Sequence, residues 1–504
     1  MIKSRIRDCK SCELIDEKVS KSALAKFVFS HTSLAFFYGL FLFLYEIKFV
    51  RGIISVLHPM LIAWAVIIVL YDIFIRKILR KIPFWIPVLL FSVSAGITLI
   101  LTCEAGIVAG IKSLILTLIP LYAFFPMCFT LPEKRRKSAV MISFLGAALV
   151  VFAASLIALG LYSVRFGRFV TLGSMQEYVG MRYYIPSDPT TGILLYGLYV
   201  DTNHAAIYAL AFAAYGILLF ISGFRKTFTA KWKNVSSMVF GAVSAAVQLC
   251  YFPMANSRGG WLALAVALTV TAFFGLFCVK FAQKKRILKT VLSVLVSAAI
   301  TVGTLGGMLL LRVGVAHLPD LVELIAADSS ITQNYFPDGD IDSDPTGDTE
   351  IGFSKNETSF DGDRILIWKD TLQVFTKRPV FGTSPSNNQY YAMKYQVGLE
   401  KIGKGCAVHN SFLDLLLDYG VIGFVLLMVF WILCAVSVLR KRFKTAENVD
   451  HIWYTAVFAV IITVCASVTL SCTFVNTTAM YFLMTVSAGY LMSYAVKPAV
   501  KKES

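Results

Sequence analysis

Long apolar runs separated by short polar segments recur along the whole chain. Each run holds about 18 or more largely apolar residues, enough for a helix to cross the hydrocarbon core of a membrane. The pattern predicts an all-α polytopic membrane protein with about 12 transmembrane helices. We expect the spans at residues 23–45, 54–75, 82–103, 107–129, 138–163, 203–223, 235–254, 259–280, 289–312, 412–439, 452–474 and 476–496.

One polar segment is far longer than the others. The chain forms a single expected integral membrane domain over residues 1–504, from which residues 313–411 emerge as a large loop between the ninth and tenth spans. Near the end of this loop apolar residues recur at helical spacing, which predicts a short amphipathic helix lying against the membrane. The residues on its apolar face are Ile365, Trp368, Leu372 and Phe375.

Composition and charge exclude other classes of protein. The chain is 57% hydrophobic and 15% charged, which is too apolar for a soluble protein of 504 residues. With a cytoplasmic N-terminus, 31 of the 47 lysines and arginines fall in the inward segments, so both termini are expected in the cytoplasm. The net charge of +17 therefore reflects topology, and we expect no nucleic-acid partner. The polar start and the long first apolar run predict no cleaved signal peptide.

Neither the acidic loop stretch nor the cysteines predict a metal site. Residues 338–350 are rich in aspartate but lack the glycine and glutamate spacing of an EF-hand, which favours a solvated segment. Most of the ten cysteines lie inside spans, which excludes a disulfide framework. Cys9 and Cys12 form a lone CxxC pair without two further ligands nearby. We therefore expect no metal and no cofactor.

Polar residues gather at the outward ends of the spans. Asp201 or Asn203 can cap the sixth span, and a ligand-facing role is an equally good interpretation. Arg258 follows a tight turn and stands at a helix N-terminus, where the helix dipole favours an anion. The alternative for Arg258 is a side chain that reaches lipid phosphate. Arg364 lies in the first turn of the amphipathic helix.

The tenth span begins beside a histidine and an amide. His409 and Asn410 precede an apolar run that continues to about residue 438, and Ser411 with Asp414 resembles a capping box. The run predicts one long helix that projects beyond the membrane core. His409 can face a substrate at the membrane surface, or it can simply bind backbone at the helix entry.

Several of these segments, in this order, resemble the O-antigen ligase and O-antigen polymerase family of bacterial membrane glycosyltransferases. The resemblance covers about residues 195–425. The chain departs from the family pattern after Gly382, where Thr383-Ser384-Pro385-Ser386 stands in place of a frequent second glycine. The matching segments are Asp201-Thr202-Asn203-His204, Ser257-Arg258-Gly259, Arg364 to Trp368, Arg378 to Gly382, His409 to Leu413 and Gly420 to Gly423.

The resemblance implies a GT-C-type fold in the bacterial cytoplasmic membrane. It implies transfer of a glycan from a polyprenyl-diphosphate-linked donor to an acceptor on the outer face, without a required metal. The acceptor can be a glycan, a lipid or a protein. The family's functional positions correspond to Arg258, Arg364 and His409. We expect the two arginines to bind the diphosphate. Further candidates for phosphate or sugar contact are Arg182, Asn203, Arg312 and Asn410.

Two other functions remain open at this point. A multi-span transporter or lipid-linked oligosaccharide flippase also fits about 12 spans, but the internal repeats and mid-membrane ionisable sites typical of transporters are not evident. A peptidoglycan glycan-strand polymerase resembles the family in fold, and the His409-Asn410 segment argues against it. The sequence does not distinguish ligase from polymerase.

Overall fold

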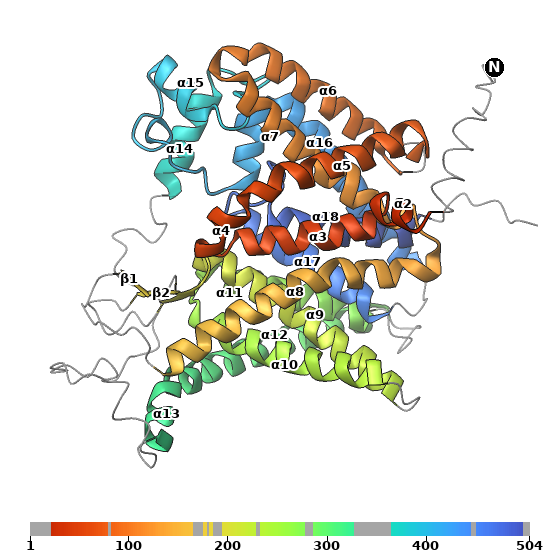
Figure 1. The fold of residues 1–504 in the computed structure, drawn as a ribbon, viewed down its shortest axis with the longest axis vertical. Coiled ribbons are helices and arrows are strands. Elements are labelled where there is room, and N and C mark those ends of the chain that lie inside the picture. Colours follow the sequence, from red (N-terminus) through yellow and green to blue (C-terminus); the bar gives the residue numbers. More distant parts are fainter. Residues whose placement is uncertain are drawn as a thin grey trace, which may run out of the picture.

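The computed structural model describes residues 22–78, 82–164, 175–178, 181–184, 194–227, 232–277, 286–326, 364–444 and 450–496. Its architecture is a bundle of helices that run back and forth across one body (Figure 1). The long helices and their neighbours are α3 (His31–Tyr45), α5 (His58–Phe74), α6 (Trp85–Leu101), α7 (Ile107–Ile119), α8 (Glu133–Ser163), α9 (Thr202–Thr227), α10 (Trp232–Met254), α11 (Arg258–Phe277), α12 (Arg286–Ala316), α16 (Ser411–Lys444), α17 (His451–Ser467) and α18 (Ala479–Ala495).

The prediction of a polytopic helical membrane protein is confirmed. Among the described residues, eight helical segments are long and apolar enough to cross a membrane. The other four expected spans correspond to α3, α6, α17 and α18, which have 15 to 17 residues each. Every expected span thus has a helical counterpart in the right order, while the count of twelve crossings stays a prediction.

Short elements join the long helices. The short helices are α2 (Ala23–Val28), α4 (Lys48–Ile54), α13 (Leu318–Ala326), α14 (Arg364–Phe375) and α15 (Asn388–Tyr395), with a π turn at Pro120–Phe124 and 3-10 turns at Ser55–Leu57, Cys103–Ala105, Phe125–Phe129 and Ile402–Lys404. A small antiparallel sheet with the order β1-β2-β3, which the all-α expectation did not include, precedes α9. Its strands are β1 (Met175–Tyr178), β2 (Met181–Tyr184) and β3 (Leu194–Gly197).

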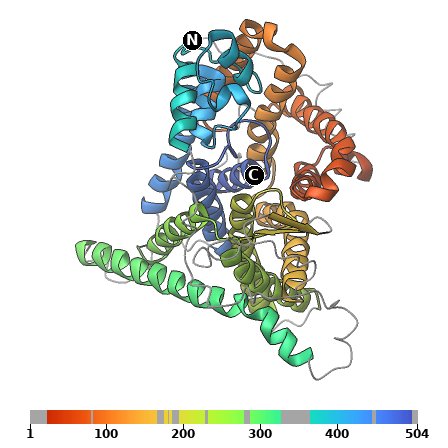
Figure 2. The same ribbon diagram turned by 90° about the vertical axis from the view of Figure 1, so that its left-hand side faces the viewer.

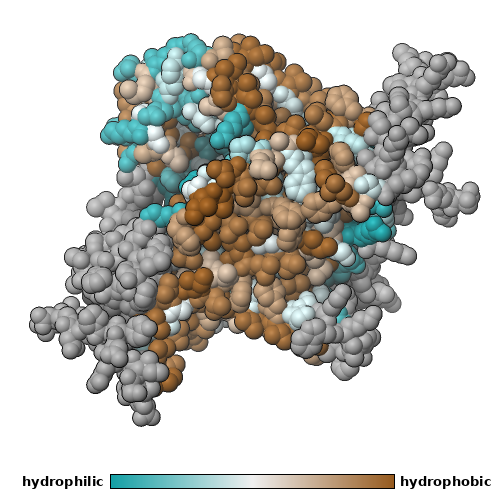
Figure 3. All heavy atoms as spheres, in the orientation of Figure 1, coloured by the Kyte–Doolittle hydropathy of each residue, from teal (hydrophilic) through white to brown (hydrophobic). Residues whose placement is uncertain are grey.

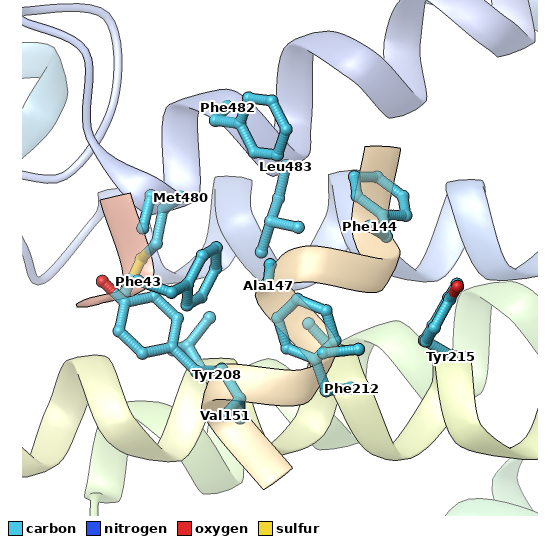
Figure 4. Close-up of a cluster of buried hydrophobic side chains, with 14 of the residues drawn as sticks. Phe43, Phe144, Ala147, Val151, Tyr208, Phe212, Tyr215, Met480, Phe482 and Leu483 are labelled. Carbon is cyan, nitrogen blue, oxygen red and sulfur yellow. The ribbon is translucent and has the colours of Figure 1, made fainter. Parts of the chain in front are cut away.

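Helix α9 is the centre of the bundle. Its residues from Ala205 to Phe212 are almost completely buried, and 72% of its apolar window lies inside the protein, against 17% for α12. Figure 4 shows aromatic side chains of α3, α8, α9 and α18 meeting around it. Phe43 packs edge-to-face on Tyr208 with ring centroids 4.8 Å apart, a geometry worth about 0.5–1.5 kcal/mol beyond area burial. The outer end of α9 is therefore held firmly in place.

The outer surface of the bundle is apolar where a membrane would cover it. Helix α12 runs obliquely along one side of the body (Figure 2) and exposes residues such as Leu295, Val302 and Leu310. Figure 3 shows hydrophobic surface over most of the bundle and hydrophilic surface gathered over α14 and α15. Such a large exposed apolar area is typical of a surface that faces lipid.

The expected unbroken tenth span is wrong, because α16 contains a break at Gly420. Gly420 adopts φ 66° and ψ −174°, which separates residues 411–419 from the rest of the helix. The loop before α15 supplies hydrogen bonds at the break. The backbone N–H groups of Thr383 and Ser384 donate to the carbonyls of Leu417 and Asp418 at 2.9 and 2.8 Å. An interrupted helix at membrane depth is tolerated where other parts of the protein satisfy its backbone groups. The large loop is thereby anchored to the bundle.

Helix α14 exists as expected, but its buried face differs from the predicted one. It packs against α16 and α15 through Ile367, Asp370, Thr371 and Val374. The buried Asp370 carboxylate accepts a hydrogen bond from the Lys401 backbone at 2.7 Å. Of the predicted apolar face, Trp368 and Phe375 pack against this loop core, whereas Ile365 and Leu372 are exposed. The helix is thus part of a folded layer that packs against α15 and α16.

Candidate functional site

The starts of α9 and α11 are locked together by side-chain caps. The Asp201 carboxylate accepts hydrogen bonds from the backbone N–H groups of Asn203 and His204 at 2.6 and 3.4 Å and so caps α9. The Ser257 hydroxyl donates to Asn203 Oδ1 at 2.7 Å and accepts from Gly260 N at 3.0 Å. Arg258, the first residue of α11, is therefore placed beside the outer end of α9.

Two glycines allow this close approach. A Cβ at Gly260 would lie 3.1 Å from Ala206 of α9, and a Cβ at Gly259 would lie 3.0 Å from the Thr469 hydroxyl. Each contact is tighter than an ordinary van der Waals distance, so a larger residue would push α11 away from its neighbours. The paired glycines thus bring Arg258 against both α9 and the segment that follows α17.

The start of α16 is tied to the same segment. Asn410 caps α16, because its Oδ1 accepts from the backbone N–H groups of Phe412 and Leu413 at 3.0 and 3.1 Å. The expected cap at Ser411 is wrong: the Ser411 hydroxyl instead donates to Leu470 O at 2.7 Å and accepts from Cys472 N at 2.9 Å. Residues 469–473 therefore contact the start of α11 on one side and the start of α16 on the other.

His409 sits in the left-handed backbone region with φ 53°. This conformation costs a non-glycine residue about 1–2 kcal/mol, although histidine tolerates it better than most. Such outliers gather at functional sites, where the surrounding structure holds them in place. Here the Asn410 cap and the Ser411 hydrogen bonds follow immediately, so His409 is held at the point where the loop enters α16.

The charges around His409 define the site. Burial lowers the pKa of His409 from its usual value, and the positive charges of Arg364 and His204 lower it further, while Asp201 raises it. Because these charges act on one imidazole, the start of α14, the start of α9 and the entry to α16 share one environment. The lowered pKa keeps His409 neutral at pH 7, where it can accept a proton.

Residues 243–428 of the chain match the family model described as O-Antigen ligase. This segment of the chain is therefore similar to the O-antigen ligase family. No curated protein matches the chain. The matched segment begins in α10 and ends in α16, so it contains Arg258, Arg364 and His409. The match supports a ligase- or polymerase-like role in surface polysaccharide biosynthesis and a glycosyltransferase-like enzyme, and the apolar helices support a multi-pass membrane protein.

The three predicted catalytic residues lie at one end of the bundle. His409 and Arg364 share one electrostatic environment. Arg258 joins them through the segment 469–473, which touches Gly259 and Ser411. In Figure 1 this end also carries α4, α14 and α15, while α2 lies at the opposite end.

The four predicted substrate-binding residues have different positions. Asn203 lies at the site, bound to Ser257, and Asn410 adjoins His409, with its side-chain oxygen engaged in the helix cap. Arg182 lies in β2 opposite Gly197 of β3, and Gly197 is four residues before Asp201. Arg312 is buried in the outer part of α12, close to Ala316, whose carbonyl accepts a hydrogen bond from Tyr162 of α8. Arg312 is not among the described charges that shift the pKa of His409.

Sequence reasoning missed two residues of this site. His204 was visible only as part of the Asp201–Asn203 segment, and Glu46 only as an acidic residue at the outward end of the first apolar run. In the structure His204 Nδ1 lies 3.7 Å from Glu46 Oε2, although the two residues are far apart in the chain. A lone carboxylate that ends an apolar run was the available signal.

No group of three metal-ligating side chains occurs in the part of the chain that the structure describes. The CxxC pair at Cys9 and Cys12 and the acidic stretch 338–350 lie outside the described residues.

Proposed function

We propose that this protein is an O-antigen ligase or polymerase that transfers a glycan from a polyprenyl-diphosphate-linked donor to an acceptor hydroxyl on the outer face of the bacterial cytoplasmic membrane. The observation that supports the proposal is that the start of α11, which bears Arg258, is joined through residues 469–473 to the entry of α16 beside His409. A part-buried neutral base with Arg364 among the charges that act on it, and with Arg258 on a joined helix start, suits a reaction in which a hydroxyl attacks and a diphosphate departs.

Arg258 and Arg364 bind the donor diphosphate in this proposal. Negative charge gathers on the diphosphate as the glycosidic bond breaks, and guanidinium groups hold phosphate oxygens through paired hydrogen bonds. Two unit charges about 4 Å apart attract by roughly 1 kcal/mol in water and about 4 kcal/mol at an effective dielectric of about 20. Partial exclusion of water beside lipid thus strengthens the contact. The position of Arg258 at the N-terminus of α11 adds the field of the helix dipole.

His409 acts on the acceptor. Its neutral imidazole accepts the hydroxyl proton as the acceptor oxygen forms the new glycosidic bond, and the departing lipid diphosphate takes the electron pair of the broken bond. Its lowered pKa supports this role because the base form persists at neutral pH. Since a sugar hydroxyl is a weak acid, we expect the arginines to contribute more than His409.

The topology belongs to the same proposal. Twelve crossings with a GT-C-type arrangement and both termini in the cytoplasm place the starts of α9, α11 and α16 at the outer surface. The diphosphate of a lipid-linked donor lies at this headgroup level. The reaction needs no nucleotide sugar and no resident metal in this scheme, and the acceptor is a glycan, a lipid or a protein.

The test is to replace each arginine separately. Arg258→Ala and Arg364→Ala should each abolish surface glycan while the protein still inserts in the membrane at normal abundance. Lys377→Ala and Lys404→Ala remove exposed cations from the outer loop and serve as matched controls that keep the glycan. Normal glycan in both arginine variants would overturn the mechanism.

A second experiment separates transfer from transport. Purified protein is placed in liposomes with lipid-linked glycan extracted from cells that lack it. A new glycosidic bond is the expected result. Movement of the lipid-linked glycan across the bilayer without any bond formation would favour the flippase alternative.

A further inference from the structure

Glu46 is held at the site by backbone pairing between two distant parts of the chain. It follows the last residue of α3. Its carbonyl accepts a hydrogen bond from Val200 N at 3.1 Å, and Lys48 N donates to Leu198 O at 3.1 Å. Ile47 and Tyr199 form an isolated β-bridge between these two bonds. The junction of α3 and α4 is thus fixed against the segment that leads into α9.

The Glu46 carboxylate faces His204 across this junction. The two side chains are 19% and 24% exposed, whereas Ala205 and Ala206, the next residues of α9, are fully buried. An acid and an imidazole at the end of an apolar bundle are stable there only if they face a polar space, because lipid solvates neither group. Both side chains are thus only part-buried at this end of α9.

The start of α9, which carries His204, is joined to the entry of α16 beside His409: Asn203 binds Ser257, Gly259 lies against Thr469, and Ser411 binds Leu470. The described charged groups that act on His409 are Arg364 from α14, Asp201 from the cap of α9 and His204 from the first turn of α9. The groups that act on His204 are Glu46 and Asp201. A line of interacting groups thus runs from Glu46 through His204 to His409, and only His409 takes part in the reaction proposed above.

We propose that Glu46 and His204 form a positioning pair for His409, in which the carboxylate holds the second imidazole beside the first and so controls the charge around the group that accepts the acceptor proton. This inference rests on the proposed function. Glu46 neither touches the donor nor accepts the proton. Its negative charge favours the protonated form of His204, and the positive charge of His204 favours the neutral form of His409.

The sign of the effect follows. Removing the Glu46 charge leaves His204 neutral more often, and removing His204 takes away a positive neighbour of His409. Either change raises the pKa of His409, so a larger fraction of His409 carries a proton near neutral pH. The acidic limb of the rate profile should move to higher pH. A loss of folding or packing alone would lower the rate by the same factor at every pH.

The experiment measures initial rates of donor consumption by the purified full-length protein in liposomes from about pH 4.5 to 8.5, a range that extends below the ordinary histidine pKa. The probe is lipid-linked glycan extracted from cells lacking the protein, with the same extract supplying acceptor. Glu46→Gln and His204→Gln should each move the acidic limb upward by about half a unit to one unit, a common size of shift for a neighbouring charge. The double variant should move it no further than His204→Gln alone.

Two controls keep the outcomes distinct. Glu104→Gln removes a different carboxylate from the outer end, one that pairs with Lys394, and should leave the limb in place. If His409→Gln abolishes the acidic limb but Glu46→Gln and His204→Gln leave it at the pH of the unchanged protein, the positioning pair alone is overturned. An unchanged limb in His409→Gln would instead overturn the role proposed for His409.

Discussion

Gly420 of the broken span lies directly against the Val380 carbonyl of the outer loop. A Cβ at Gly420 would stand 2.2 Å from the Val380 oxygen, closer than any real side chain approaches. Gly382 of the loop lies equally close to the span, because a Cβ there would stand 2.5 Å from the Leu417 oxygen. Loop and span are thus fitted backbone to backbone, which fixes residues 364–410 relative to the membrane helices. This contact holds the loop that contains Arg364 and His409 against the bundle.

Gly420→Ala should therefore release the loop. Alanine is strained at φ 66° by about 1–2 kcal/mol, and its Cβ would also displace Val380. We expect a lower Tm of the purified protein in detergent and faster protease cleavage between residues 364 and 410. Gly303→Ala in α12 is the matched control, because nothing lies within 4 Å of its Cβ. Equal stability of the two variants would contradict the fitted contact.

Ser257→Ala should uncouple the starts of α9 and α11. The substitution removes the hydrogen bond to Asn203 and the cap on Gly260 N together, a loss of about 1–2 kcal/mol. Because Arg258 is the next residue, the glycan-forming rate should fall more than the stability does. Ser257→Thr keeps the hydroxyl and should retain most activity. Ser437→Ala, which loses only a bond to Leu433 O within its own helix, should have little effect on the rate.

The rate should fall on acidification, and this acidic limb of the pH–rate profile should lie below the ordinary pKa of histidine. Burial and Arg364 lower the pKa of His409, so its neutral form persists through neutral pH and is lost only as the pH falls well below about 6.5. The same depressed pKa stabilises the fold above about pH 6.5, and this stability is lost on acidification as the imidazole gains its proton. His409→Gln should remove the limb and lower the rate by about a hundredfold. A limb centred above pH 7 would contradict the assignment.

The outer loop is held to the α6–α7 turn by contacts of unequal strength. Lys394 Nζ pairs with Glu104 Oε1 at 2.6 Å, and this pair lowers the pKa of Glu104, but both side chains are well exposed. Arg378 donates to Gly382 O and Leu101 O at 3.0 and 3.1 Å and lies 4.7 Å over the Tyr391 ring. Lys394→Ala should thus leave the Tm unchanged, whereas Arg378→Ala should lower it measurably. The reverse order in a thermal melt would contradict this ranking.

The periodicity of apolar residues predicted the helices well. Each expected span meets a helix, because burial in lipid requires long apolar runs whatever the tertiary contacts are. The candidate residues Arg258, Arg364 and His409 were also visible, since a charged or titratable residue at the end of an apolar run needs an explanation. Apolar periodicity does not reveal where a helix breaks. The break at Gly420 depends on hydrogen bonds from Thr383 and Ser384, which no local pattern encodes.

The sequence by itself determined a helical membrane protein with polar groups at the outer ends of its spans. Only the tertiary structure decided which of those groups meet. Asn410 caps α16 in place of the predicted Ser411, because the Ser411 hydroxyl forms hydrogen bonds with residues 470–473. Glu46 reached His204 because backbone pairing joins residues 46–48 to residues 198–200. Such contacts link residues 59 or more positions apart, so their geometry is set by packing in the bundle rather than by neighbours in the chain.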